Sequence, residues 1–206
     1  MSESINNGFF LVLEGIDGSG KTSIANKLVE ELTGMGYKVV YTYEPWDSYY
    51  IKILKEHYSF VRDAALDALT YAADRLIHIR LFIKPYLERG FLVICDRYYY
   101  SSVAYQSAQG ADLEWVLEIN KYVLNPDLAI YLDVDPLTGL RRRQRLRSRF
   151  PEYEELDLLY RVREIYLELV RRGYMILVDA RRDFDSVYKD VKNLVLAYLR
   201  KTTSHV

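Results

Sequence analysis

The most specific chemical pattern in the sequence is a glycine-rich stretch near its start. Gly15, Gly20, Lys21 and Thr22 fit the pattern G-x-x-x-x-G-K-[ST]. In this pattern the glycines permit a tight loop whose N–H groups surround a phosphate, the lysine reaches the β- and γ-phosphates, and the hydroxyl group ligates Mg²⁺. A turn that merely links a strand to a helix is the alternative, but the pattern seldom arises by chance. We therefore predict that ATP binds to the following loop residues: Gly15, Ile16, Asp17, Gly18, Ser19, Gly20, Lys21 and Thr22.

A carboxylate and a guanidinium group stand side by side after a later apolar run. Asp96 and Arg97 follow the segment FLVIC at 91–95. The carboxylate could hold Mg²⁺ directly or through water, and the planar arginine fork suits a phosphate held by two hydrogen bonds. A surface Asp–Arg pair is the plainer interpretation. The phosphate loop in the same chain favours a magnesium site at Thr22 and Asp96, and a site for an acceptor phosphate at Arg97.

A run of arginines forms the third pattern, because residues 140–150 read LRRRQRLRSRF. Such a run could bind nucleic acid, or it could bring positive charge to a smaller anion. The chain has 28 Lys and Arg against 29 Asp and Glu, with a formal net charge of −1. It therefore lacks the basic field on which non-specific nucleic-acid binding depends. We expect no nucleic-acid partner and a local role for these arginines.

Strands and helices must alternate along the chain to position these groups. Short apolar, β-branched or aromatic runs predict buried strands at 9–13, 38–43, 91–95, 128–134 and 175–179. Helical sequence follows the first run, where Ile24 and Leu28 share a face and Gly34 and Gly36 end the helix. Pro85 is expected to bend a later helical segment. The alternation predicts an α/β fold with a parallel sheet, helices on both faces, and ligands at the carboxyl ends of the strands.

Length and composition limit the class of protein. With 206 residues, of which 50% are hydrophobic, the chain is expected to form a single domain over residues 1–206. Its one cysteine, Cys95, can form no internal disulfide and fits a reducing compartment. No signal-peptide pattern is visible, and no apolar run approaches the roughly 20 residues that span a bilayer. We expect a soluble, cytoplasmic protein with no membrane partner.

Taken together, the motifs resemble those of the thymidylate kinase family of P-loop nucleoside monophosphate kinases. The resemblance runs from about Phe10 to Asp179 and keeps the order EGIDGSGKT, EP, LTYAADR, DRYYYSSVAYQ, PDLAIYLDVDP, RSRF and RVREIYLEL. It implies a P-loop NTPase-type five-stranded parallel sheet with helices on both faces and an arginine-rich lid at about 140–153. It also implies ATP-dependent phosphorylation of dTMP to dTDP, Mg²⁺ as cofactor, and a homodimer.

The resemblance also implies roles for residues that would bind the acceptor. Arg97 would hold its phosphate, and Asp17 and Glu44 would lie near its sugar and phosphate. Tyr71 takes the position of the aromatic ring that stacks on thymine, and Arg75 that of the arginine that hydrogen-bonds the base. Four residues apart on a helix, Tyr71 and Arg75 share one face. The alternative is that Tyr71 packs in the core and that Arg75 pairs with an acid.

A short predicted helix after Arg97 carries the remaining acceptor residues. Ser101, Ser102, Tyr105 and Gln106 all lie on it. By resemblance, Ser102 and Gln106 would read the edge of the base. Tyr105 matches the position that crowds the 2′ carbon of the sugar and so favours deoxyribose.

The arginine run falls where this family carries the lid that closes over ATP. Phosphoryl transfer requires positioning and positive charge around the phosphate oxygens, and a closing arginine segment supplies both. The variable positions of the P-loop include no arginine. We therefore expect the lid to act through Arg149 first, then Arg145 and Arg141. The expected catalytic set is Lys21, Arg97, Arg149, Arg145 and Asp17.

One departure from the family pattern leaves acceptor selectivity open. Many members have arginine before Glu-Pro, but here Tyr43 precedes Glu44 and Pro45. A tyrosine hydroxyl brings one hydrogen bond and no charge, so phosphate binding would depend more heavily on Arg97. A deoxynucleoside kinase, with a carboxylate such as Glu44 as base, is one alternative. The other is a non-catalytic P-loop regulatory protein.

Overall fold

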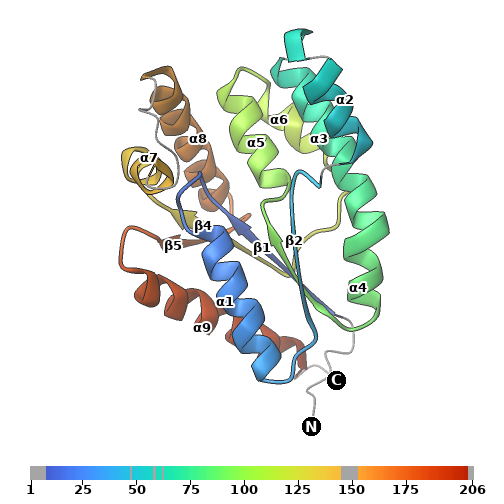
Figure 1. Cartoon of the computed structure of the whole chain (residues 1–206), viewed down its shortest axis with the longest axis vertical. Coiled ribbons are helices and arrows are strands. Elements are labelled where there is room, and N and C mark those ends of the chain that lie inside the picture. Colours follow the sequence, from blue (N-terminus) through green and yellow to red (C-terminus); the bar gives the residue numbers. More distant parts are fainter. Residues whose placement is uncertain (1–7, 47, 58, 62, 145–152, 204–206) are drawn as a thin grey trace.

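Five parallel strands form one sheet at the centre of the molecule, in the order β2-β3-β1-β4-β5 (Figure 1). The computed structural model describes residues 8–46, 48–57, 59–61, 63–144 and 153–203. The strands are β1 (Phe9–Glu14), β2 (Val39–Tyr43), β3 (Leu92–Asp96), β4 (Leu128–Asp133) and β5 (Ile176–Asp179). The predicted α/β fold and its five strands are therefore confirmed.

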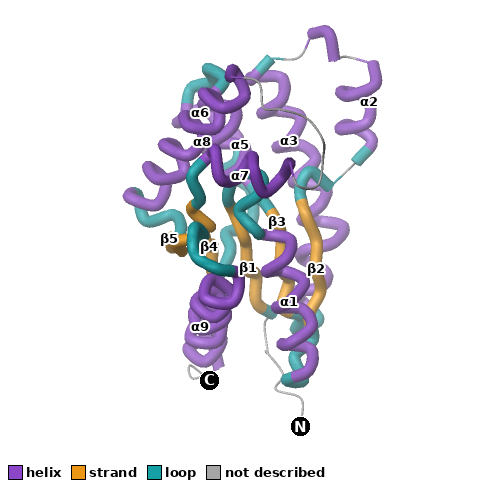
Figure 2. The backbone as a smooth tube through the Cα atoms, turned by 60° about the vertical axis from the view of Figure 1, so that its left-hand side comes forward, coloured by secondary structure: helices purple, strands orange, loops and turns teal. Residues whose placement is uncertain are grey.

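Helices and short helical turns connect the strands. They are α1 (Lys21–Gly34), α2 (Tyr49–His57), η1 (Ser59–Val61), α3 (Ala64–His78), η2 (Ile79–Ile83), α4 (Lys84–Glu88), α5 (Tyr99–Ala108), α6 (Leu113–Ile119), α7 (Pro136–Gln144), α8 (Tyr153–Arg171) and α9 (Phe184–Thr203). Figure 1 shows α1 and α9 on one side of the sheet and α3, α4 and α5 on the other. Figure 2 shows the strands enclosed between these groups of helices. Among the described residues, no helix combines the length and the apolar character needed to cross a membrane.

The central strand β1 explains where polar residues converge. It pairs with β3 from Phe9 opposite Leu92 and with β4 from Leu11 opposite Leu128, and every residue of β1 is buried. Strands β1 and β3 are neighbours in the sheet. After β1 the chain continues to β2, on one side of this pair, and after β3 it continues to β4, on the other side. Adjacent strands whose connections diverge leave a crevice at their carboxyl ends, where ligands of such sheets bind. The phosphate loop and the Asp96–Arg97 pair both open into this crevice.

The long helical segment before β3 contains a widened turn. Residues 79–83 form a π-helix, in which the N–H of Lys84 donates to the carbonyl of Ile79, and Pro85 follows at the start of α4. A proline inside a helix cannot donate a hydrogen bond, and its ring crowds the carbonyl four residues earlier. The bend expected at Pro85 stays a prediction, and the structure shows a widened helical turn just before this residue.

Candidate active site

The phosphate loop connects β1 directly to α1. Gly15, Gly18 and Gly20 have φ angles of 146°, 81° and 98°, values that side-chain-bearing residues rarely adopt. Gly20 precedes the first residue of α1, so no side chain caps the helix and its N–H groups stay open to an anion. Lys21 is buried, and its Nζ donates to the carbonyl oxygens of Gly15 at 2.9 Å and Ile16 at 3.0 Å.

Burial changes the acidity of Lys21. Removal from water disfavours the charged ammonium group, and the nearby positive charge of Arg97 adds to this effect. Together they lower the pKa of Lys21 to about 8, although the carboxylates of Asp96 and Asp17 partly oppose the change. A bound polyphosphate would restore the charged form of this lysine.

Thr22 and Asp96 meet at the mouth of the loop, as predicted for a magnesium site. The Thr22 hydroxyl donates to Asp96 Oδ2 at 2.5 Å, and the Tyr41 hydroxyl lies 3.4 Å from the same oxygen. Hydroxyl and carboxylate oxygens are hard ligands, and Mg²⁺ is commonly held by one or two such groups together with water and substrate phosphates. The donor set at this position therefore fits Mg²⁺.

A cavity of about 720 Å³ extends from the phosphate loop. Its lining includes loop residues from Asp17 to Thr22 together with Asp96 and Arg97. At the far end it is lined by residues that the sequence analysis did not select: Arg142, Ala180, Arg182, Asp183, Phe184 and Val187. Most of these follow β5, so the rule that ligands lie at the carboxyl ends of strands is the signal that could have identified them.

The arginine segment is described only in part. Arg145 and Arg149, the lid residues expected to act first, lie outside the described residues. Arg141, on α7, is exposed, whereas its neighbour Arg142 lines the large cavity and donates to the carbonyl of Ala180 at 2.9 Å. Helix α7 also approaches the phosphate loop through two glycines, since a Cβ atom on Gly139 would lie 2.7 Å from the carbonyl oxygen of Asp17.

Arg97 adopts an unusual backbone conformation where β3 ends. Its φ angle is 72°, in the left-handed region, and its N–H donates to the carbonyl of Leu13 at 2.9 Å. The guanidinium group donates to Asp17 at 2.5 Å and to Ser101 Oγ at 3.2 Å, and it lies 5.4 Å from the centre of the Tyr105 ring. The phosphate loop and α5 therefore hold the guanidinium group, and β1 holds the backbone of Arg97.

A second cavity, of about 270 Å³, opens on the other side of Arg97. Every residue predicted to bind the acceptor lines it: Glu44, Tyr71, Arg75, Arg97, Ser101, Ser102, Tyr105 and Gln106. Asp67, Asp74, Tyr98 and Gln109 line it as well. Asp17 and Arg97 line both this cavity and the large one, so they stand where the two meet. Tyr43, by contrast, is 52% exposed.

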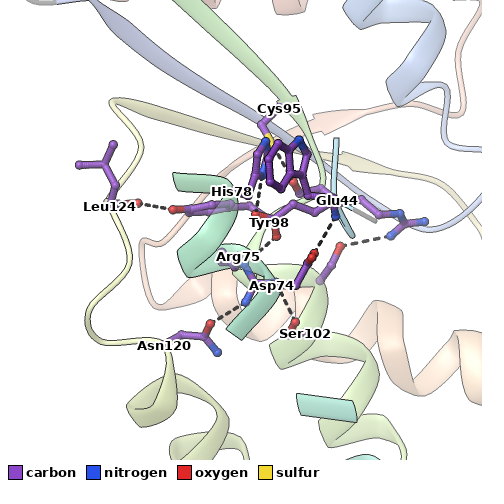
Figure 3. Close-up of polar contacts among 12 residues, drawn as sticks. Glu44, Asp74, Arg75, His78, Cys95, Tyr98, Ser102, Asn120 and Leu124 are labelled. Carbon is purple, nitrogen blue, oxygen red and sulfur yellow. Dashed lines mark hydrogen bonds and ion pairs between the residues drawn. The ribbon is translucent and has the colours of Figure 1, made fainter. Parts of the chain in front are cut away.

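Buried polar groups hold Arg75 at the floor of the smaller cavity. Figure 3 shows Arg75 pointing toward Glu44, Asn120 and Ser102. Its Nε donates to Glu44 at 2.7 Å, and its other nitrogens donate to Asn120 at 2.5 Å and to Ser102 at 3.0 Å. The pairing with an acid weighed as an alternative therefore exists, with Glu44 as the acid, and Arg75 still lines the cavity.

Glu44 also belongs to a buried cluster with His78 and Cys95 (Figure 3). Its Oε1 lies 3.2 Å from His78 Nδ1, and the other ring nitrogen lies 2.7 Å from the Thr42 hydroxyl. The Cys95 thiol donates to the carbonyl of Arg97 at 3.0 Å. Because Glu44 pairs with His78 and Arg75, and the Cys95 thiol with a backbone carbonyl, the cluster is a hydrogen-bonded support for the cavity floor.

A carboxylate on α3 shapes the loop that follows Glu44. Asp74 accepts hydrogen bonds from the N–H groups of Trp46 at 2.7 Å and Ser48 at 3.1 Å, and the Glu44–Pro45 peptide bond is cis. The Trp46 ring stacks on His78 with centroids 5.1 Å apart. This loop forms one wall of the smaller cavity.

One buried acid next to the site, Glu14, was not predicted from the sequence. Glu14 is fully buried at the end of β1. Burial raises its pKa above the ordinary value, while hydrogen bonds from Ser101 and Tyr166 and the charge of Arg97 oppose the change. A glutamate that ends an otherwise apolar strand was the available signal, because a charge is rarely buried without partners.

Comparison with known proteins gives a consistent result. A family model described as thymidylate kinase matches residues 13–191. A probable thymidylate kinase of Staphylothermus marinus is 68% identical over 199 residues, covering 97% of this chain and 99% of that protein. Probable thymidylate kinases of Pyrococcus horikoshii and Pyrobaculum calidifontis are each 40% identical, covering 91% and 93% of this chain and 96% and 100% of those proteins.

Proposed function

The chain belongs to the thymidylate kinase family, and on this premise we propose that it transfers the γ-phosphate of ATP to dTMP, giving dTDP and ADP. The observation that carries the proposal is the junction of two cavities at Asp17 and Arg97. A phosphate loop opens into one cavity, and an arginine fork faces the other. This arrangement would bring a donor and an acceptor phosphate together.

The donor would bind along the larger cavity. Backbone N–H groups of residues 15–22 would surround its phosphates, and Lys21 would leave the loop carbonyls to reach the β- and γ-phosphates. The rest of the nucleotide would extend toward Arg142, Arg182 and Phe184. Thr22 and Asp96 would hold Mg²⁺, which when bound neutralises charge on the phosphate oxygens.

The acceptor would bind in the smaller cavity with its phosphate on Arg97. Arg97 is always charged, and a guanidinium fork binds phosphate oxygens in pairs. Asp17 would keep the fork aligned through the hydrogen bond already present at 2.5 Å. Because the acceptor oxygen belongs to an ionised phosphate, the reaction needs orientation and positive charge but no strong base.

The base and sugar of the acceptor would occupy the remainder of this cavity. Tyr71 would stack on thymine, and Ser102 and Gln106 would contact its edge. A guanidinium group carries five N–H donors, so Arg75 keeps donors for the base beyond those engaged by Glu44, Asn120 and Ser102. Tyr105 packs beneath Arg97, where its ring would exclude a 2′-hydroxyl group.

Steady-state ADP production tests this proposal. The panel would contain ATP and Mg²⁺ with dTMP, dUMP, dCMP, dGMP, ribothymidine monophosphate, thymidine or no acceptor. We expect dTMP to lead and thymidine to be inert. Activity on thymidine but not on dTMP would support a deoxynucleoside kinase instead, and an acceptor-independent rate would leave only a nucleotide-binding protein.

The arginine assignments are tested by substitution. Arg97→Ala is expected to lower kcat/KM for dTMP by roughly 100-fold or more, the size of a lost electrostatic contact to the reacting phosphate. Arg149→Ala is expected to lower kcat more than it weakens dTMP binding, because a lid contact would form on closure. An unchanged kcat in the Arg149 variant would remove the lid assignment.

We further propose that the protein is a cytoplasmic homodimer that binds no nucleic acid. Leu69 on α3 and Leu81 on η2 are 50% and 67% exposed, which supports an interface on this segment. Light scattering of the wild type and of Leu69→Lys and Leu81→Lys variants tests it. A monomeric wild type would refute the dimer, and intact variant dimers would refute this interface.

The net charge of −1 supports the absence of nucleic-acid binding, which a gel-shift assay tests.

A further inference from the structure

Glu14 is the acceptor of a compact group of hydrogen bonds beside the acceptor site. Its Oε1 accepts from the N–H groups of Tyr98 at 2.7 Å and Ser101 at 3.2 Å. Its Oε2 accepts from the hydroxyl groups of Ser101 at 2.6 Å and Tyr166 at 2.8 Å. These donors come from α5 and α8, so one carboxylate on β1 ties three elements together.

The same carboxylate caps α5. Tyr98, the residue before this helix, makes no side-chain cap of its own. Glu14 takes that role from another part of the chain: it accepts from the N–H of Tyr98 and shares the N–H of Ser101 with the Tyr98 carbonyl. A negative charge at the positive end of a helix adds to the stabilisation. Because Arg97 directly precedes Tyr98, this cap also fixes the backbone from which the Arg97 side chain leaves.

Ser101 connects the cap to the guanidinium group. In the short contact to Glu14 Oε2 the Ser101 hydroxyl donates its hydrogen. The oxygen of Ser101 is then left to accept from Arg97, whose NH1 lies 3.2 Å away. Glu14 therefore determines which way the hydroxyl points, and the hydroxyl steadies one side of the arginine fork.

Tyr166 supports this chain from α8. The residue is fully buried, and its ring stacks on Tyr131 with centroids 4.7 Å apart and planes inclined by 18°. Its hydroxyl lies 2.8 Å from Glu14 and 2.9 Å from the Ser101 oxygen. The rigidly packed Tyr166 side chain thus holds the Glu14 carboxylate and the Ser101 hydroxyl in place. It belongs to the RVREIYLEL motif, to which the proposed reaction assigns no role.

We propose that Glu14 and Tyr166 are positioning residues that orient Arg97, through Ser101, toward the phosphate of the acceptor. The proposal rests on the proposed function, in which Arg97 binds that phosphate. Neither residue lines the acceptor cavity, so their effect on binding must pass through Ser101 and Arg97.

Dissociation constants for dTMP and thymidine, measured with Tyr166→Phe by calorimetry, test the proposal. Phenylalanine keeps the ring and its stacking but removes the hydroxyl. We expect dTMP to bind about five-fold more weakly, the scale of one hydrogen bond, and thymidine, which has no phosphate, to bind as before. Tyr188→Phe is the matched control, because its hydroxyl contacts the carbonyl of Lys27 at 3.4 Å and Tyr188 lines neither cavity. It is expected to leave both constants unchanged.

A double variant shows whether the effect passes through Arg97. In an Arg97→Ala background, Tyr166→Phe should have no further effect on dTMP binding. Equal weakening of dTMP and thymidine, additive effects, or no effect of Tyr166→Phe in the wild-type background would each overturn the proposal. Glu14→Gln, checked for folding by thermal unfolding, should reproduce the loss specific to dTMP. If Arg97→Ala itself leaves dTMP binding intact, the acceptor-site assignment fails instead.

Discussion

Lys21 and Arg97 place two positive charges next to one buried site, and the charge of Arg97 affects the acidity of Lys21. Arg97 is the second cause of the lowered pKa of Lys21, after burial. The charges are tolerated because the carboxylates of Asp17 and Asp96 lie near them and partly offset their repulsion. Anionic phosphates in the same space would be attracted to both cations. The site is thus arranged for phosphate before any nucleotide binds.

This coupling predicts the pH dependence of ATP binding. The pKa of Lys21 is about 8 in the folded protein against 10.5 ordinarily, so the free enzyme loses this charge as the pH rises above 8. ATP favours the charged form, and its dissociation constant should increase toward about ten-fold per pH unit beyond that point. Titrations with ATP at pH 7 to 9.5 measure it.

Two variants test whether Lys21, and not another titratable group, causes the pH dependence of ATP binding. Lys21→Arg keeps its charge over this range and should give a flat profile. Arg97→Ala removes a neighbouring positive charge and should shift the onset to higher pH. A wild-type profile that stays flat to pH 9.5 would contradict the assignment of the low pKa to this lysine.

At the scale of elements, the contact between α7 and the phosphate loop is controlled by two glycines. A Cβ atom on Gly18 would lie 2.1 Å from the carbonyl oxygen of Gly139, and one on Gly139 would lie 2.7 Å from that of Asp17. Both distances are shorter than backbone atoms tolerate. The helix that leads into the arginine segment can therefore approach the loop only because both positions lack side chains.

Gly139→Ala should displace α7 from the loop. We expect a loss of about 1–3 kcal/mol in stability, as for other overpacked sites, and a raised KM for ATP, although the substitution removes no group that binds a ligand. Gly34→Ala, at the end of α1, meets nothing within 4 Å and should be neutral or slightly stabilising. Chemical denaturation and ATP kinetics of both variants test this prediction. Equal stability and an equal KM for ATP in the two variants would contradict the close contact between α7 and the phosphate loop.

Local patterns sufficed to predict most elements, because the strands are continuous apolar runs and the P-loop has a fixed spacing. The acceptor residues were predicted from motifs, and all of them line one cavity. Glu14, Asn120 and Tyr166 were missed, since their partners are distant in sequence and no local pattern relates them. The left-handed backbone of Arg97 was missed too, because an arginine in the sequence gives no indication of a positive φ angle.

Across the whole molecule, charged residues join helices that are not consecutive in the chain. Arg172 donates to Glu114 on α6 at 2.5 Å and to Glu168 on α8 at 2.9 Å. Arg171 shares Glu168 at 2.8 Å. Isolated surface pairs contribute little, but networks gain importance as temperature rises. This network ties α6 to the longer helix α8.

Arg172→Gln should therefore lower the melting temperature more than Lys121→Gln does. Lys121 pairs with Glu118 only three residues away, so its loss disconnects no elements. High salt should shrink the difference between the variants, because it screens the network. Differential scanning calorimetry at low and high salt measures both effects, and an equal or reversed ranking would show that the network does not join the helices energetically.

The backbone of Arg97 has a consequence for how this sequence can change over time. At a φ angle of 72°, a residue with a side chain costs about 1 kcal/mol more than glycine does. Arg97→Gly should thus melt at a higher temperature than Arg97→Ala, while the activity of both is strongly reduced. Selection for folding stability alone would favour glycine at this position. If Arg97 binds the acceptor phosphate as proposed, an arginine persists there only while phosphoryl transfer is under selection, and the residue at position 97 then indicates whether a descendant of this chain is still an enzyme.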